Sequence, residues 1–116
     1  MKAIRHGAAA AIVLLMLGSS LHSAPIRIDD SLKKIPIGLY IDFLKDEKVT
    51  LSISDVSGPS QGSFWTPSTE TYPGFGFTGT VYWARFTVIN TTGKEISFFL
   101  EHGYPIVSDL QLFTPE

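Results

Sequence analysis

The sequence contains no cysteine, which excludes disulfide bonds, thiolate metal sites and thiol nucleophiles. Charge is also scarce: charged residues make up 17% of the chain, and 9 Lys and Arg residues stand against 11 Asp and Glu residues. Without a basic excess, the chain lacks the electrostatic footprint of a nucleic-acid-binding protein. The length of 116 residues and the hydrophobic fraction of 44% fit one small folded domain that is stabilised by packing.

Long apolar runs are rare as well, and the chain has one near its start. Two basic residues precede an uncharged apolar run at positions 8–17, an order that is typical of a secretory signal peptide. The run is shorter than the about 20 residues that span a bilayer, although an uncleaved membrane anchor is the alternative. We expect cleavage between Ser20 and Ser23, so that residues 1–23 form the signal peptide and residues 24–116 form a periplasmic domain.

Alternation of apolar and polar residues, typical of β-strands, recurs along the rest of the chain. It is clearest at Val49–Val56, and Val81–Ile89 carries apolar residues on both faces, as in a central strand. A turn signal at Asn90–Gly93 predicts an antiparallel hairpin between this strand and Ile96–Leu100. Two further segments are predicted as strands, of which the first would also tolerate a helical turn: Gly38–Leu44 and Leu110–Phe113.

A long connection from Ser57 to Thr80 separates two of these strands and is rich in Gly, Pro, Ser and Thr. Connections of this length are unusual in compact domains unless they are functional or pack their own side chains. Five aromatic residues argue that it is ordered: Phe64, Trp65, Tyr72, Phe75 and Phe77. Short strands without a long amphipathic helix predict an all-β fold, an antiparallel sandwich or barrel.

Three runs and two later strands resemble a known family. They are IGLYIDFLKD from Ile37, VTLSI from Val49, VYWARFTVIN from Val81, and the strands at Ile96–Glu101 and Asp109–Phe113. Together they resemble the second extracellular domain type of bacterial seven-transmembrane receptors with diverse intracellular signalling modules (7TMR-DISM). The resemblance implies a jelly-roll-like antiparallel β-sandwich, similar to carbohydrate-binding modules, in the periplasm. It also implies seven membrane helices and an output domain beyond Glu116, so we expect the domain to be incomplete at its carboxyl end.

Residues suited to catalysis are few. His102 is the only histidine outside the expected signal peptide, and no nucleophile elbow accompanies it. The acidic residues cannot be paired from sequence as a glycosidase requires. Two pairs, Asp29 with Asp30 and Asp42 with Asp46, could offer oxygens to calcium but lack the spacing of a calcium loop. We therefore predict no enzyme activity, no cofactor and no metal site.

The aromatic residues favour a ligand site instead. Sugars stack their C–H faces on aromatic rings while neighbouring polar groups bind the hydroxyls. The predicted ligand-binding residues are Trp65, Tyr72, Phe75, Phe77, Trp83 and Arg85. The alternative for each is core packing, including a guanidinium over an indole for the last two, which adjoin on one strand face. The predicted partner is a small molecule such as a carbohydrate, bound by a sensor domain. The alternative is a structural or protein-interaction module that binds no small ligand.

Overall fold

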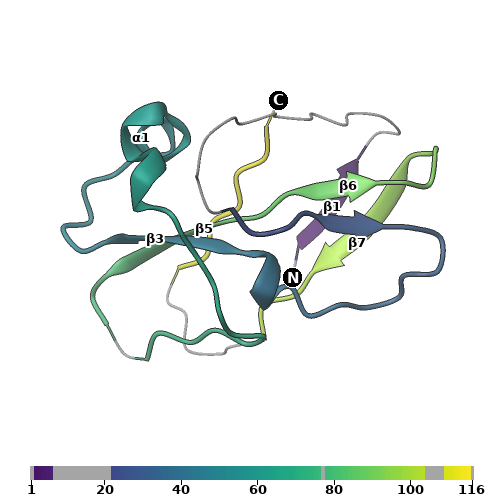
Figure 1. The fold of residues 1–116 in the computed structure, drawn as a ribbon, viewed down its shortest axis with the longest axis horizontal. Coiled ribbons are helices and arrows are strands. Elements are labelled where there is room, and N and C mark those ends of the chain that lie inside the picture. The colour runs from purple at the N-terminus through teal and green to yellow at the C-terminus, as the bar shows by residue number, and fades with distance from the viewer. Residues whose placement is uncertain (1, 7–21, 77, 104–108, 116) are drawn as a thin grey trace.

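The computed structural model describes residues 2–6, 22–76, 78–103 and 109–115 (Figure 1). Strands dominate this part of the chain, which confirms the all-β class. The strands are β1 (Lys2–His6), β2 (Ile26–Ile28), β3 (Asp42–Asp46), β4 (Thr66–Pro67), β5 (Val81–Arg85), β6 (Val88–Asn90) and β7 (Ile96–Leu100). Helical turns are short: η1 (Gly38–Tyr40) and η2 (Pro59–Phe64) are 3₁₀-helices, and α1 (Ile53–Ser57) is a single α-helical segment.

The strands form three small sheets. One has the order β4-β3-β5 and is antiparallel, while β1 pairs antiparallel with β7, and β2 pairs parallel with β6. In Figure 1 the β4-β3-β5 sheet occupies one side of the molecule and the two strand pairs occupy the other. The parallel β2–β6 pair departs from the antiparallel prediction, and this arrangement does not confirm the jelly roll.

The strand predicted at Val49–Val56 is wrong, and the departure begins at a tight turn after β3. The Asp46 carboxylate accepts hydrogen bonds from the backbone N–H groups of Thr50 and Leu51, both at 3.1 Å. Val49, within this turn, has a φ of 54°, in the left-handed region that β-branched residues rarely adopt. The turn redirects the chain, so the alternating residues that follow do not extend β3.

A capping box then starts α1 in place of a strand. The Asp55 backbone N–H donates to Ser52 Oγ at 3.3 Å, and the Ser52 backbone N–H donates to Asp55 Oδ2 at 2.8 Å. Reciprocal bonds of this kind satisfy N–H groups that a helix start otherwise leaves unpaired. The helix buries Val56 and leaves Ile53 exposed.

The other strand predictions are confirmed in part. Val81–Ile89 is interrupted after Arg85, and β5 lies at an edge of its sheet where a central strand was predicted, since β3 takes the centre. At the interruption the Ile26 N–H donates to the Thr87 carbonyl at 2.8 Å, which leads the chain into the β2–β6 pair. The predicted hairpin is therefore absent among the described strands, because β6 pairs with β2 and β7 pairs with β1.

Two predicted terminal strands also differ from the structure. Gly38–Leu44 begins as η1 and becomes extended at β3, so the helical turn and the strand both occur. Leu110–Phe113 has no regular secondary structure. The Phe113 ring instead lies 5.9 Å from the Trp83 ring, centroid to centroid. This segment therefore packs against β5 through a side chain and not through a strand ladder.

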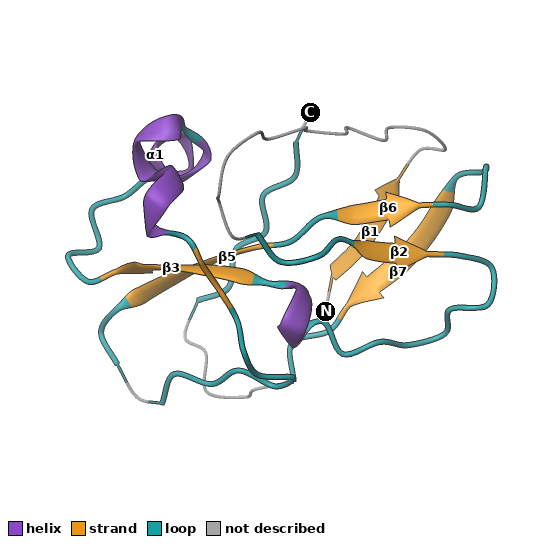
Figure 2. Cartoon of the chain, in the orientation of Figure 1, coloured by secondary structure: helices purple, strands orange, loops and turns teal. Residues whose placement is uncertain are grey.

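The main core lies between the β4-β3-β5 sheet and α1. Leu44 on β3, Val56 on α1 and Trp65 after η2 are buried together, with Leu51 and Trp83 packed against them. Figure 2 shows α1 above this sheet, where it covers one face. These apolar side chains are buried between α1 and one face of the sheet. The opposite face of the sheet is not covered by α1.

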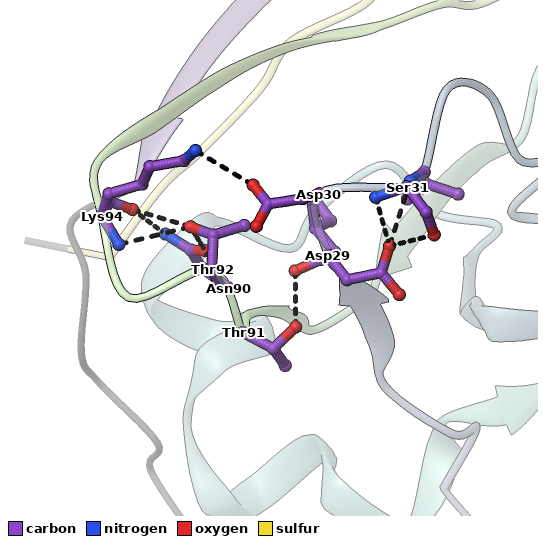
Figure 3. A network of polar contacts seen from close by, with 9 residues as sticks. Asp29, Asp30, Ser31, Asn90, Thr91, Thr92 and Lys94 are labelled. Atoms are coloured by element: carbon purple, nitrogen blue, oxygen red, sulfur yellow. Dashed lines mark hydrogen bonds and ion pairs between the residues drawn. The ribbon is translucent and has the colours of Figure 1, made fainter.

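A network of polar contacts ties the end of β2 to the end of β6 (Figure 3). The Thr91 hydroxyl and backbone N–H both donate to the Ile28 carbonyl, at 2.9 Å each. Lys94 Nζ lies 3.0 Å from Asp30 Oδ1, while Asn90 Oδ1 accepts from Thr92 and closes the predicted turn. Asp29 accepts from the backbone N–H and the hydroxyl of Ser31 in a local turn, so it is part of this connection.

Candidate functional site

The two faces of β3 have different chemistry. Asp42, Leu44 and Asp46 are buried and face the core, whereas Phe43 and Lys45 alternate with them and face the other way. In the register with β5, Asp42 lies opposite Arg85 and Leu44 lies opposite Trp83. Directly opposed residues share a face of an antiparallel pair, so Arg85 and Trp83 also belong to the core face.

On the core face, Arg85 connects an indole ring and a carboxylate. Its guanidinium carbon lies 4.3 Å from the centroid of the Trp65 ring, within the range of a cation–π interaction. Its Nε lies 3.2 Å from Asp42 Oδ2. The guanidinium is thus stacked on Trp65, whereas the sequence suggested its strand neighbour Trp83, whose indole N–H points to Asp46 Oδ2 at 3.5 Å.

Both core-face carboxylates are held in their charged form. Burial raises the pKa of Asp42, but the hydrogen bonds from Ser23 and the contact with Arg85 outweigh burial and lower the pKa below its ordinary value. Burial likewise raises the pKa of Asp46, and the backbone N–H groups of Leu51 and Thr50 outweigh it, so that pKa is also lowered. These carboxylates therefore organise the fold around β3.

No metal centre emerges from this arrangement. The described residues contain no group of three or more His, Asp or Glu side chains placed to hold a metal ion. Asp42 is engaged by Arg85 and Ser23, and Asp46 by the turn that follows β3. Arginine is a donor only, and its charge next to Asp42 opposes a bound cation.

The outer face of the same sheet carries an aromatic cluster, defined here as Phe43, Phe75 and Tyr82. The Phe75 ring stacks on the Tyr82 ring, with centroids 3.8 Å apart and planes 14° apart. It also meets Phe43 edge to face, with centroids 4.9 Å apart. Such pairs are stabilised beyond their buried area, so this cluster fixes one end of the long connection against the sheet.

A shallow groove of about 200 Å³ opens beside this cluster. Phe43 and Phe75, with Pro67 and Pro73, give it apolar walls, and it is otherwise lined by Thr66, Ser68, Thr69, Glu70 and Gly74. Side-chain hydroxyls and one carboxylate thus stand next to aromatic rings. This combination suits a ligand with both apolar faces and hydroxyl groups.

The groove is held in place from beneath by η1 and β3. The backbone N–H of Ser68 donates to the Ile41 carbonyl at 2.8 Å. Gly38 lies so close to the backbone of Glu70 and Thr71 that a Cβ at this position would overlap their carbonyl oxygens. The segment with Glu70 therefore rests directly on a glycine, and the shape of the groove depends on that close approach.

The structure separates the six predicted ligand residues. Trp65 is 9% exposed and lies with Trp83 and Arg85 on the core face, while Phe75 lies in the groove. Tyr72 is 79% exposed and does not line the groove, and Phe77 lies outside the described residues. Ligand contact by these residues stays a prediction, and the geometry supports Phe75 best.

Sequence reasoning missed Phe43 and Tyr82. Both occur in strands that were otherwise recognised, at positions that alternate with core residues. The available signal was this alternation: Phe43 stands between Asp42 and Leu44, so it must face away from them. Only the strand register brings Tyr82 to the same side.

Comparison with known proteins gives one match. Residues 38–116 match the family model described as 7TMR-DISM extracellular 2. No curated protein and no solved structure matches the chain significantly. The matched range contains the aromatic cluster, the groove and Arg85, and it begins at the glycine beneath the groove.

Proposed function

We propose a ligand-sensing role for this chain, which belongs to the 7TMR-DISM extracellular 2 family. The family assignment makes the chain a sensor-type domain of a transmembrane receptor and implies an exported location. Among residues 2–6, 22–76, 78–103 and 109–115, no helix is long and apolar enough to cross a membrane. Export through an amino-terminal signal peptide, and a periplasmic location, are part of this proposal.

The proposed ligand is a small carbohydrate, and the proposed site is the groove beside the aromatic cluster. The observation that carries this proposal is Phe75, which is 41% exposed and yet fixed by rings on two sides. A ring held in one orientation loses little conformational entropy when a sugar stacks on it. The Glu70 carboxylate and the neighbouring hydroxyls offer acceptors and donors for sugar hydroxyls.

The test is a thermal-shift screen of the exported chain against mono- and oligosaccharides. A saccharide that binds only the folded state at 100 times its Kd stabilises it by about 2.7 kcal/mol. We expect at least one saccharide to raise Tm, and we expect Phe75→Ala to abolish that rise. Phe64→Ala is the matched control, because Phe64 is 63% exposed and lies outside the groove.

A second variant covers the case in which Phe75→Ala unfolds the chain. Glu70→Gln keeps the shape of the groove wall and removes its carboxylate, so we expect a weaker saccharide-induced shift with an unchanged Tm in the absence of sugar. A full shift in both groove variants would contradict the site.

Substitution of Trp65 should act differently from substitution of Phe75. Because Trp65 is buried against Arg85, Trp65→Ala should cost about 3–5 kcal/mol of unfolding free energy, measured by urea denaturation. Its Nε1 is buried without a hydrogen-bond partner among the described residues, so Trp65→Phe removes an unsatisfied group and should cost less than half as much. Equal losses in the two variants would contradict this account of Trp65.

The burial of Trp65 also favours a second candidate function, a protein-interaction module. In that case the exposed aromatic residues, such as Phe64 and Tyr72, would contact a protein partner and the groove would bind no sugar. The same screen separates the two functions, because a panel without any Tm increase would favour the interaction module.

A further inference from the structure

The buried Asp42 carboxylate needs more hydrogen-bond donors than the neighbouring strand β5 supplies. Its side chain lies in the core face of β3 and the residue is 4% exposed. A carboxylate buried in this way is costly unless its oxygens are paired. Arg85 contacts Oδ2 at 3.2 Å through Nε, which leaves Oδ1 to be satisfied by other groups.

The donors to Oδ1 come from Ser23, far away in sequence. The Ser23 backbone N–H donates to Asp42 Oδ1 at 2.9 Å, and its hydroxyl lies 2.7 Å from the same oxygen. The hydroxyl also lies 3.1 Å from the Ile41 carbonyl. Among the described residues, Ser23 is the only source of hydrogen bonds to Oδ1.

His22 adds a contact to the other member of the pair. Its Nδ1 lies 2.7 Å from Arg85 Nη2 and 3.6 Å from Asp42 Oδ2. Because a guanidinium only donates, Nδ1 is the acceptor in this contact. His22 and Ser23 together thus complete the surroundings of the Asp42–Arg85 pair.

We infer that His22 and Ser23 belong to the mature domain, and that export processing cuts the chain ahead of His22. A cut after Ser23 would remove both donors to Asp42 Oδ1 and the acceptor for Arg85 Nη2. This inference rests on the proposed export of the chain. It moves the start of the domain from residue 24, as predicted from sequence, to residue 22 or earlier.

The first experiment is intact-mass analysis of the full-length chain expressed in a Gram-negative host, with periplasm and cytoplasm separated. The expected result is a periplasmic product that has lost its amino-terminal segment, residue 1 included, and still contains His22. A periplasmic product that begins at Ser23 or later would overturn the inference and leave the proposed export intact. An uncleaved chain found only in the cytoplasm would overturn the proposed export, and the processing with it.

The second experiment tests the contact itself by thermal unfolding of the purified chain. Ser23→Ala should lower Tm by about 6–24 °C, the shift that corresponds to one hydrogen bond to a charged group in a domain of this size. Ser23→Thr retains a hydroxyl and should restore most of the loss. Ser63→Ala is the control, since Ser63 is exposed and makes no side-chain hydrogen bond among the described contacts. Equal Tm values for Ser23→Ala and Ser63→Ala would overturn the inference.

Discussion

Replacing Gly38 by alanine should destabilise the domain more than the addition of a single methyl group suggests. A Cβ at Gly38 would overlap the carbonyl oxygens of Glu70 and Thr71. Both are backbone atoms, so no side-chain rotation can relieve the overlap, and the segment that lines the groove must move. Overpacking of this kind costs about 1–3 kcal/mol, and each kcal/mol lowers Tm by about 4–8 °C in a domain of this size.

Thermal unfolding monitored by tryptophan fluorescence measures this loss, with Gly62→Ala as the matched control. Gly62 lies in η2, and a Cβ there would meet nothing within 4 Å. We expect Gly62→Ala to change stability little or to add about 0.4–1 kcal/mol through the unfolded state. Equal Tm values for the two variants would refute the close approach beneath the groove.

Two further predictions concern the carboxylates around β3 and α1. Ser52→Ala removes the capping hydroxyl of α1 and should lower the unfolding free energy by about 1 kcal/mol, measured by urea denaturation; no loss would contradict the capping box. The pKa values of Asp42 and Asp46 are lowered in the folded state, so their stabilisation is present above the unfolded pKa of about 3.9 and is lost as the pH falls below it. Tm measured from pH 6 to pH 2 should therefore fall below about pH 4, and Asp42→Asn should flatten that fall; a wild-type Tm independent of pH would contradict it.

The wrong strand prediction at Val49–Val56 shows that alternation of apolar and polar residues does not by itself decide secondary structure. Val49, Leu51 and Ile53 alternate with polar residues, but the chain turns because Asp46 accepts two backbone N–H groups. The Ser52-to-Asp55 spacing was visible in the sequence as a capping box, a local signal that competes with a period of two. The burial of Asp46 was not visible, because it depends on contacts with β5, where the Trp83 indole N–H lies 3.5 Å from Asp46 Oδ2.

For the site, the sequence identified the aromatic connection but not the face to which each ring belongs. Trp65 and Phe75 occur in the same segment and lie on opposite faces of the sheet. Their separation follows from the position of β4 between them and from the contact of Phe75 with Tyr82 on β5. Pairing between segments about forty residues apart is not encoded in a local pattern, so the sequence could supply the residue types but not their grouping.

The pairing of β1 with β7 has a consequence for biogenesis. β7 pairs with Lys2–His6, the segment that the proposed processing removes. The processed chain would then lack the β1–β7 ladder, which includes Phe99, a residue that is 71% exposed. The precursor and the processed domain therefore differ in strand pairing at β7, so the unfolding free energy of one is not that of the other.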